Sequence, residues 1–209
     1  MRVTVTRDEM VRHVRRLGIR DPRVLEALTR VPREEFVRDA DRDAAHGDHA
    51  LPIGEGQTIS QPYVVARMTE LLDVRPENHV LEVGTGSGYQ AAVLGELAKD
   101  VVSVERHRSL ADGARERLAR LGYGNVRVIH EDASLGYPAE APYDRIIITA
   151  ATPSIEPALS AQLAPGGRLV APVGDEEMQE LVVRDSRGRE EHHGAVRFVP
   201  LRGRAGFGP

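Results

Sequence analysis

The sequence predicts an α/β fold, with a doubly wound and mostly parallel sheet that carries helices on both faces. From residue 79 onward, short runs rich in β-branched residues alternate with segments of helical spacing. Apolar runs bounded by turn residues are typical of strands buried on both faces, as in a parallel sheet. Consecutive strand–helix units join by right-handed crossovers and therefore build a doubly wound sheet.

Short helices and an irregular loop are expected before that core. Residues 7–30 have apolar side chains at helical spacing on both sides of a Gly–Pro break, which predicts two short helices. Residues 39–56 are polar and irregular, and the stretch PIGEGQTISQP closes them. Pro62 suits the first turn of a further helix, where a missing N–H costs nothing, and apolar residues follow it at helical spacing.

The core elements are expected in alternation. Strands are predicted at 79–83, 101–105, 126–130, 143–150 and 167–174, and helices at 91–98, 110–121 and 155–163. Two more strand-like runs follow, ELVVRD and AVRFVPL, with no strong helix between them. An antiparallel edge of the sheet is the expected use for these two runs.

Composition and charge exclude several classes of function. The net charge of −4 and the lack of a basic stripe argue against nucleic acid as an obligatory partner. Without cysteine there is no disulfide, thiolate zinc site or cysteine nucleophile. His192 and His193 point to opposite faces of a strand, so no metal site is expected. No signal peptide or membrane span is recognisable, and a cytoplasmic protein is expected.

A glycine-rich turn follows the first core strand. In VLEVGTGSG, Gly84, Gly86 and Gly88 allow a sharp turn and the close approach of a ligand. The dinucleotide fingerprint G-x-G-x-x-G is not matched because position 89 is Tyr, and no G-K-[ST] of a Walker loop follows. Taken alone, such a turn is equally well explained as a plain strand–helix connection.

Three carboxylates near strand ends indicate the ligand. Glu105 lies about 20 residues after the turn, where an acidic side chain can accept both hydroxyls of a ribose. Glu82 would repel phosphates but suits a ligand with a sulfonium and an ammonium group. Asp132 can accept from an adenine amino group, although alone it could be a turn former. Together they predict a site for S-adenosylmethionine.

Several stretches closely resemble the protein-L-isoaspartate O-methyltransferase family: VLEVGTGSGYQAAVL, LPIGEGQTISQPYVVARMTELL, IIITAATP and VRFVPL. The similarity runs over nearly the whole chain, and GQTISQP is far more specific to this family than the glycine turn, which class I methyltransferases share. The resemblance implies a repair enzyme. Such an enzyme methylates the free α-carboxylate of L-isoaspartyl residues in damaged proteins or peptides, with S-adenosyl-L-homocysteine as the other product.

The resemblance also implies roles for individual residues, with Ser60 as the active-site serine. Substrate contacts are expected from Gly56, Gln57, Thr58, Ser60, Val196, Arg197 and Phe198. Cofactor contacts are expected from Thr58, Ile59, Glu82, Gly84, Thr85, Gly86, Ser87, Gly88, Glu105, Arg106, Asp132 and Ala133. Two departures stand out: Glu131 and Ala133 flank Asp132 where the family usually has glycines, and His46 replaces a usual aromatic residue.

One monomeric methyltransferase domain is expected over 1–209. It divides into N-terminal helices with the substrate loop (1–62), the cofactor-binding core (63–177), C-terminal strands (178–201) and a disordered tail (202–209). The expected partners are proteins and peptides that contain isoaspartyl residues, with no nucleic acid and no membrane.

The loop before Pro62 explains how such a carboxylate could be methylated. Small and hydroxyl residues offer hydrogen-bond donors without filling the space that a peptide must enter. Ser60 is therefore interpreted as an orienting donor, and a helix N-cap is its structural alternative. Two other functions stay open: a carboxyl methyltransferase acting on aspartate in a biosynthetic peptide, and a protein that binds the cofactor without catalysis.

Overall fold

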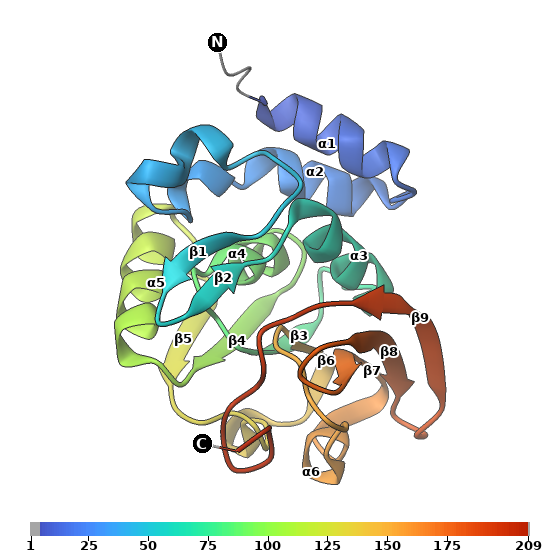
Figure 1. Cartoon of the computed structure of the whole chain (residues 1–209). Helices are drawn as coiled ribbons and strands as arrows, with labels where there is room; N and C mark the ends of the chain where they lie inside the picture. Colours follow the sequence, from blue (N-terminus) through green and yellow to red (C-terminus); the bar gives the residue numbers. More distant parts are fainter. Residues whose placement is uncertain (1–4, 209) are drawn as a thin grey trace.

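A seven-stranded sheet organises the structure, a computed structural model that describes residues 5–208 (Figure 1). The strand order is β5-β4-β3-β6-β7-β8-β9. The parallel strands are β3 (His79–Val83), β4 (Asp100–Glu105), β5 (Val126–His130), β6 (Tyr143–Ile148) and β7 (Leu163–Gly174). β8 (Gln179–Asp185) and β9 (Glu190–Val196) continue the sheet antiparallel. The expected fold class is confirmed, including the antiparallel C-terminal edge.

The strand order reverses beside β3. The chain passes from β3 outward to β4 and β5, then returns to place β6 on the other side of β3. The register pairs Val83 with Val104 of β4 and with Ile148 of β6, so the segments after these strands start at one level. In open α/β sheets, ligands bind in the crevice outside the carboxyl ends of the strands at such a reversal.

The two faces of the sheet are covered unequally. α3 (Pro62–Leu72), α4 (Tyr89–Gly95) and α5 (Arg108–Arg120) bury their apolar residues in one cluster with Val80 of β3. On the other face, Leu81 joins a second cluster with Leu159 of the short α6 (Pro157–Ser160), near the 3-10 helix η3 (Pro138–Glu140). Neighbouring strand residues point to opposite faces, which places Val80 and Leu81 in different clusters.

The two expected N-terminal helices are confirmed as α1 (Arg7–Arg16) and α2 (Pro22–Arg30). Thr6 and Glu9 form a capping box at the start of α1, and Asp21 caps α2 ahead of Pro22. Both helices lie on the α3 side of the sheet (Figure 1). Met1–Thr4 and Pro209, at the ends of the expected segments 1–62 and 202–209, lie outside the described residues.

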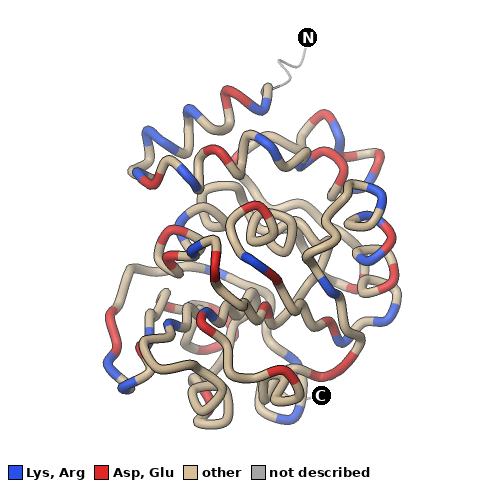
Figure 2. Tube along the Cα trace, turned by 180° about the vertical axis from the view of Figure 1, so that it is seen from behind, with Lys and Arg blue, Asp and Glu red and all other residues tan. Residues whose placement is uncertain are grey.

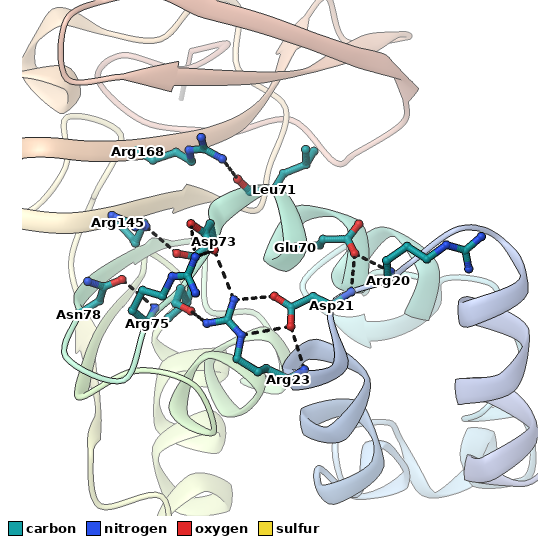
Figure 3. A network of polar contacts seen from close by, with 11 residues as sticks. Arg20, Asp21, Arg23, Glu70, Leu71, Asp73, Arg75, Asn78, Arg145 and Arg168 are labelled. Atoms are coloured by element: carbon teal, nitrogen blue, oxygen red, sulfur yellow. Dashed lines mark hydrogen bonds and ion pairs between the residues drawn. The ribbon is translucent and has the colours of Figure 1, made fainter.

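A polar network joins α2 to α3 and to the sheet (Figure 3). Glu70 of α3 accepts the backbone N–H of Asp21 at 2.9 Å, and the Asp21 carboxylate pairs with Arg23 at 2.6 Å. Asp73 pairs with Arg23 at 3.3 Å and accepts from Arg145 of β6 through its carbonyl at 3.0 Å. Asp73 lies before the N-terminal end of β3, so this network stabilises the edge of the sheet opposite to the crevice.

Two core elements differ from the sequence expectation. The segment over 39–56 and the stretch PIGEGQTISQP that closes it were expected to be irregular. They instead contain the 3-10 helix η2 (Asp39–Ala44) and a hairpin of β1 (Leu51–Gly54) and β2 (Gln57–Ile59), and the 3-10 helix η1 (Arg33–Glu35) precedes them. The helix predicted over 155–163 is shorter than expected. It covers only α6, Pro157–Ser160, and β7 already begins at Leu163.

The last strand and the tail also differ from expectation. β9 covers 190–196 rather than 195–201, because the chain then leaves β8 and bonds to Ala151 beyond β6, where Leu201 N donates to the Ala151 carbonyl at 2.7 Å. Residues 202–208, expected to be disordered, form a hydrogen-bonded turn. Phe207 N donates to the Leu201 carbonyl at 2.9 Å, and the Phe207 ring packs on the core. The tail is thus folded against the protein.

Charges of both signs are interspersed along the chain, as Figure 2 shows from the rear. Many are paired with each other, as between Arg115 and Asp112 at 2.6 Å. None of the helices within residues 5–208 has the length and apolar character that a membrane span requires. The same part of the chain has no cluster of three or more His, Asp or Glu side chains arranged to hold a metal ion.

Candidate active site

Two adjoining pockets lie at the carboxyl edge of the sheet. The serine-side pocket is named for Ser60 and spans about 600 Å³ of empty space that is partly open to solvent. The aspartate-side pocket is named for Asp132 and spans about 450 Å³, likewise partly open. Their walls share four residues, so they are two ends of one cleft: Gln57, Gly84, Glu105 and Ala150.

The glycine turn forms the floor between the two ends. Gly84 has φ +96°, and a β-carbon there would lie 2.6 Å from the Thr149 hydroxyl. That hydroxyl donates to the backbone carbonyls of Val83 and Gly84, which fixes the turn against β6. Gly86 has φ +54° and lines the serine-side pocket, whereas Gly88 packs against α5 and lies outside both walls. Only glycine readily adopts these angles.

Glu105 stands where the two pockets meet. Its carboxylate accepts the backbone N–H of Gly86 at 2.9 Å and that of His107 at 2.9 Å, one on each oxygen. The side chain is nearly buried, yet it belongs to both walls. An ionised carboxylate can accept about four hydrogen bonds, so room remains for two hydroxyl donors of a ligand.

Glu82 lies behind the turn and is fully buried. One carboxyl oxygen bonds to the Ser103 hydroxyl, which also bonds to Thr85, while the other oxygen has no partner among the described residues. Burial raises the pKa of Glu82 to about 8; the Ser103 hydrogen bond opposes this rise, and the nearby charge of Glu105 adds a smaller upward contribution. Glu82 is therefore protonated at neutral pH, and it contacts the cleft only through its neighbours.

Asp132 is held by the chain itself. Its oxygens accept the backbone N–H of Ser134 at 2.9 Å and that of Arg204, in the tail, at 3.0 Å. Burial alone would raise the pKa of Asp132, but these donors outweigh it and lower the pKa. Ala205 N donates to the Ser134 hydroxyl at 3.1 Å, so the tail closes this end of the cleft.

The hairpin of β1 and β2 forms the outer wall of the serine-side pocket. Its turn contains Glu55 and Gly56 at positive φ, and the Glu55 carboxylate accepts from the Ser109 hydroxyl of α5 at 2.6 Å. This contact ties the hairpin tip to the body of the protein. The strand after the turn supplies four consecutive wall residues: Gln57, Thr58, Ile59 and Ser60.

Ser60 does not cap α3, so the N-cap alternative is wrong. Gln61 occupies the cap position without a side-chain cap bond, and Tyr63 N instead donates to the Asp48 carboxylate at 2.9 Å. Within residues 5–208 the Ser60 hydroxyl has no hydrogen-bond partner, while its carbonyl accepts from Arg33 at 2.8 Å. The hydroxyl is therefore available to a ligand in the pocket.

The cleft gathers most, but not all, of the expected site residues. Those in its walls include Thr85, Ser87 and Phe198 on the serine side and Arg106 and Ala133 on the aspartate side. Five expected residues lie outside both walls: Gly56, Glu82, Gly88, Val196 and Arg197. Phe198 reaches the pocket because its backbone N–H donates to the buried Gln179 side chain at 2.8 Å.

Several wall residues were not predicted. Thr149 and Ala150 follow β6, and the rule that ligands meet strand ends would have indicated them. Tyr89 and Gln90 open the helix after the glycine turn, next to predicted residues. Arg202 and Leu201 line the aspartate-side pocket from the segment beyond β9, and no local pattern in the sequence marks them.

The chain matches, over residues 5–206, the family model described as Protein-L-isoaspartate(D-aspartate) O-methyltransferase (PCMT). It belongs to this family. A relative named protein-L-isoaspartate O-methyltransferase from Methanoculleus marisnigri is 54% identical over 205 residues, covering 96% of this chain and 93% of the relative. Another of the same name, from Methanoregula boonei, is 57% identical over 194 residues, covering 91% and 89%.

Solved structures agree with the PCMT assignment. One named protein-L-isoaspartate O-methyltransferase gives a TM-score of 0.86 at 28% identity and covers 96% of this chain and 67% of that chain. A Plasmodium falciparum structure in complex with S-adenosyl-L-homocysteine gives 0.81 at 22% identity, covers 93% and 97%, and supports the fold. Membership in the PCMT family confirms the expected enzyme class, an S-adenosylmethionine-dependent carboxyl methyltransferase.

Proposed function

We propose that this PCMT enzyme transfers the methyl group of S-adenosylmethionine to the free α-carboxylate of L-isoaspartyl residues in damaged proteins and peptides, and so starts their repair. One observation carries the proposal. The serine-side pocket is walled by the Gln57–Ser60 segment and by the glycine turn with Glu105. An acceptor held by the first wall and a methyl donor held by the second would share one enclosed space.

The residues of the cleft fit S-adenosylmethionine. Gly84 and Gly86 leave the floor free of side chains, and Glu105 offers unused acceptor positions to ribose hydroxyls. The aspartate-side pocket combines the apolar Val104 and Leu201 with Asp132, which suits an adenine ring. When bound, S-adenosylmethionine supplies an electrophilic methyl carbon on a sulfonium sulfur.

The acceptor needs orientation rather than deprotonation. A carboxylate with a pKa near 4 is ionised at neutral pH, so methyl transfer to it requires no general base. The wall of the serine-side pocket is consistent with this. Within the described chain, its titratable residues are Glu105 and Tyr89, and no histidine is among them. Ser60 acts as a hydrogen-bond donor that turns one carboxylate oxygen toward the methyl group. Holding the reacting atoms about 3–3.5 Å apart and excluding water can lower the barrier by several kcal/mol.

Two peptides of identical sequence test the proposal, one with an L-isoaspartyl residue and one with an L-aspartyl residue. The isoaspartyl peptide should be methylated and the aspartyl peptide left unmodified, as measured by the formation of S-adenosyl-L-homocysteine and by mass spectrometry of the peptides. Equal methylation of both would favour the aspartate-modifying alternative. Calorimetric binding of the cofactor without turnover on either would favour the non-catalytic alternative.

The proposal also covers the setting of the reaction. The enzyme acts as a cytoplasmic monomer on protein and peptide partners, with neither nucleic acid nor membrane involved. The acidic and basic residues interspersed along the trace in Figure 2 support the absence of nucleic acid, because they form no long basic run for phosphates. Light scattering of the purified protein at micromolar concentration, with and without cofactor, tests the monomer, and a dimer in either sample would contradict it.

A further inference from the structure

Arg33 is a fully buried cation that lies behind the serine-side pocket. Its side chain has 0% exposure. The guanidinium donates through Nε to the Ala45 carbonyl at 2.8 Å and through Nη2 to the Ser60 carbonyl at 2.8 Å. Its central carbon lies 4.7 Å from the centre of the Tyr89 ring. One side chain thus holds two segments of backbone and one aromatic ring of the pocket.

The charge of Arg33 lacks a counter-ion. No carboxylate within residues 5–208 forms an ion pair with it, and Asp48 attracts it only from beyond ion-pairing distance. Nη1 and the Tyr89 hydroxyl are buried and form no hydrogen bond of good geometry, although the two side chains lie close enough to attract each other. Burial lowers the pKa of the Arg33 guanidinium, but arginine stays charged in proteins. An uncompensated buried charge is costly, so its presence here needs an explanation beyond packing.

The pocket in front of Arg33 has no positive charge of its own. Ser60 and Tyr89 are wall residues, whereas Arg33 is not. Among the described residues that line this pocket, none is Lys, Arg or His, and Glu105 is the sole carboxylate. The acceptor in the proposed reaction is nevertheless an anion. Apart from the sulfonium of the bound donor, a positive charge that attracts this anion must therefore come from behind the wall.

We infer that Arg33 is a positioning residue for methyl transfer: it fixes Ser60 and Tyr89 and supplies, from behind them, the positive charge that holds the acceptor carboxylate in the serine-side pocket. The inference rests on the proposed function. A charge in the low-dielectric interior acts strongly over a short distance, and the two carbonyl bonds keep it from moving toward solvent. The isoaspartyl carboxylate is then the missing counter-ion of Arg33.

Two substitutions separate the charge from the geometry. Arg33→Met keeps a long side chain and removes the charge, and replacing a buried charge by an apolar side chain often preserves stability. Arg33→Lys keeps the charge but cannot reproduce the planar fork that bonds to Ala45 and Ser60. Arg145→Met is the matched control, because Arg145 is a half-buried guanidinium that also donates to two carbonyls, those of Asp73 and Asp144 at 3.0 and 2.8 Å, at the opposite edge of the sheet (Figure 3).

The readouts are the Kd for S-adenosyl-L-homocysteine by calorimetry and the kcat and KM for the isoaspartyl peptide. For Arg33→Met we expect a Kd within about threefold of wild type, a KM raised at least about tenfold and a kcat/KM lowered about 100-fold, the effect of losing hydrogen bonds to a charged group. Arg33→Lys should recover most of the KM but not all of the kcat. Arg145→Met should leave kcat/KM within about twofold.

Each outcome bears on a different claim. Arg33→Met with normal cofactor binding and an unchanged KM for the peptide would overturn the inference. If Arg33→Met does not fold, Arg33→Lys decides, since a kcat and KM equal to those of wild type would equally overturn it. Absence of turnover by the wild type on the isoaspartyl peptide would instead refute the proposed function.

Discussion

The two ends of the cleft differ in how their polar groups are satisfied. At the aspartate end, the Asp132 carboxylate already accepts backbone N–H groups of Ser134 and of Arg204 in the tail. At the serine end, the Ser60 hydroxyl lies in the pocket wall and has no hydrogen-bond partner within residues 5–208, and behind the wall the Tyr89 hydroxyl and one Arg33 nitrogen are buried without one. Buried polar groups in native proteins are normally paired. One end is therefore completed by the chain itself, whereas the other leaves the Ser60 hydroxyl available to a ligand.

Removal of the Ser60 hydroxyl is the most severe test of this difference. Because that hydroxyl orients the acceptor, Ser60→Ala should lower kcat for the isoaspartyl peptide about 100-fold, as loss of one positioned donor does elsewhere. Cofactor affinity should stay within a few-fold of wild type, measured by calorimetry. Ser186→Ala, whose hydroxyl accepts from Gly166 N away from the cleft, is the control and should leave kcat unchanged. An unaltered rate in Ser60→Ala would remove Ser60 from the mechanism.

Glu105 lines both pockets, and its substitution tests how the cofactor is held where the two ends meet. Glu105→Gln keeps the shape but loses the charge, and its amide NH2 cannot accept from Gly86 N or His107 N. We expect cofactor affinity to fall about 10–100-fold, the range for hydrogen bonds to a charged group. Titration calorimetry with S-adenosyl-L-homocysteine measures it, and Glu116→Gln, an exposed position on α5 outside both pocket walls, is the control. Wild-type affinity in Glu105→Gln would exclude the expected ribose contact.

A substitution in the tail should change cofactor binding at the aspartate end only weakly. Gly203 has φ +150°, and a β-carbon there would lie 2.3 Å from a carboxylate oxygen of Asp132. Gly203→Ala should therefore displace the turn over 202–208 and weaken cofactor binding about three- to tenfold, while kcat at saturation stays within about twofold. Gly188→Ala has the same kind of backbone strain with no atom in the way, and its affinity should match wild type. A large fall in kcat for Gly203→Ala would show that the two ends are not separable.

The difference between the ends also marks what the sequence could predict. The glycine turn and Glu105 were predictable because their spacing along one strand–helix–strand unit, from β3 through α4 to the end of β4, determines where they lie. Arg33 was not, since its partners Ser60 and Tyr89 are distant in sequence and meet it only in the folded protein. The folded tail was missed for the same reason: residues 202–208 look polar and glycine-rich alone, but the N–H groups of Arg204 and Ala205 donate to Asp132 and Ser134. Local patterns predict elements and strand ends, and they do not predict long-range polar contacts.

The smallest expected effect is a pH dependence caused by Glu82, the unpaired acid behind the glycine turn. Its pKa is about 8 in the folded protein, whereas a glutamate in the unfolded chain titrates near 4.3. The stabilising contribution of its proton is therefore complete below pH 4.3 and is lost as pH rises through about 8. The Tm of wild type should fall between pH 6 and pH 9 more steeply than that of Glu82→Gln. Each kcal/mol of unfolding free energy that is lost lowers the Tm by about 2–4 °C.

Scanning calorimetry at matched ionic strength measures the Tm of both proteins, with the exposed Glu77→Gln as control. Parallel curves for wild type and Glu82→Gln would mean that Glu82 is ionised in the folded state, and the serine end would then hold a fixed negative charge beneath the glycine turn.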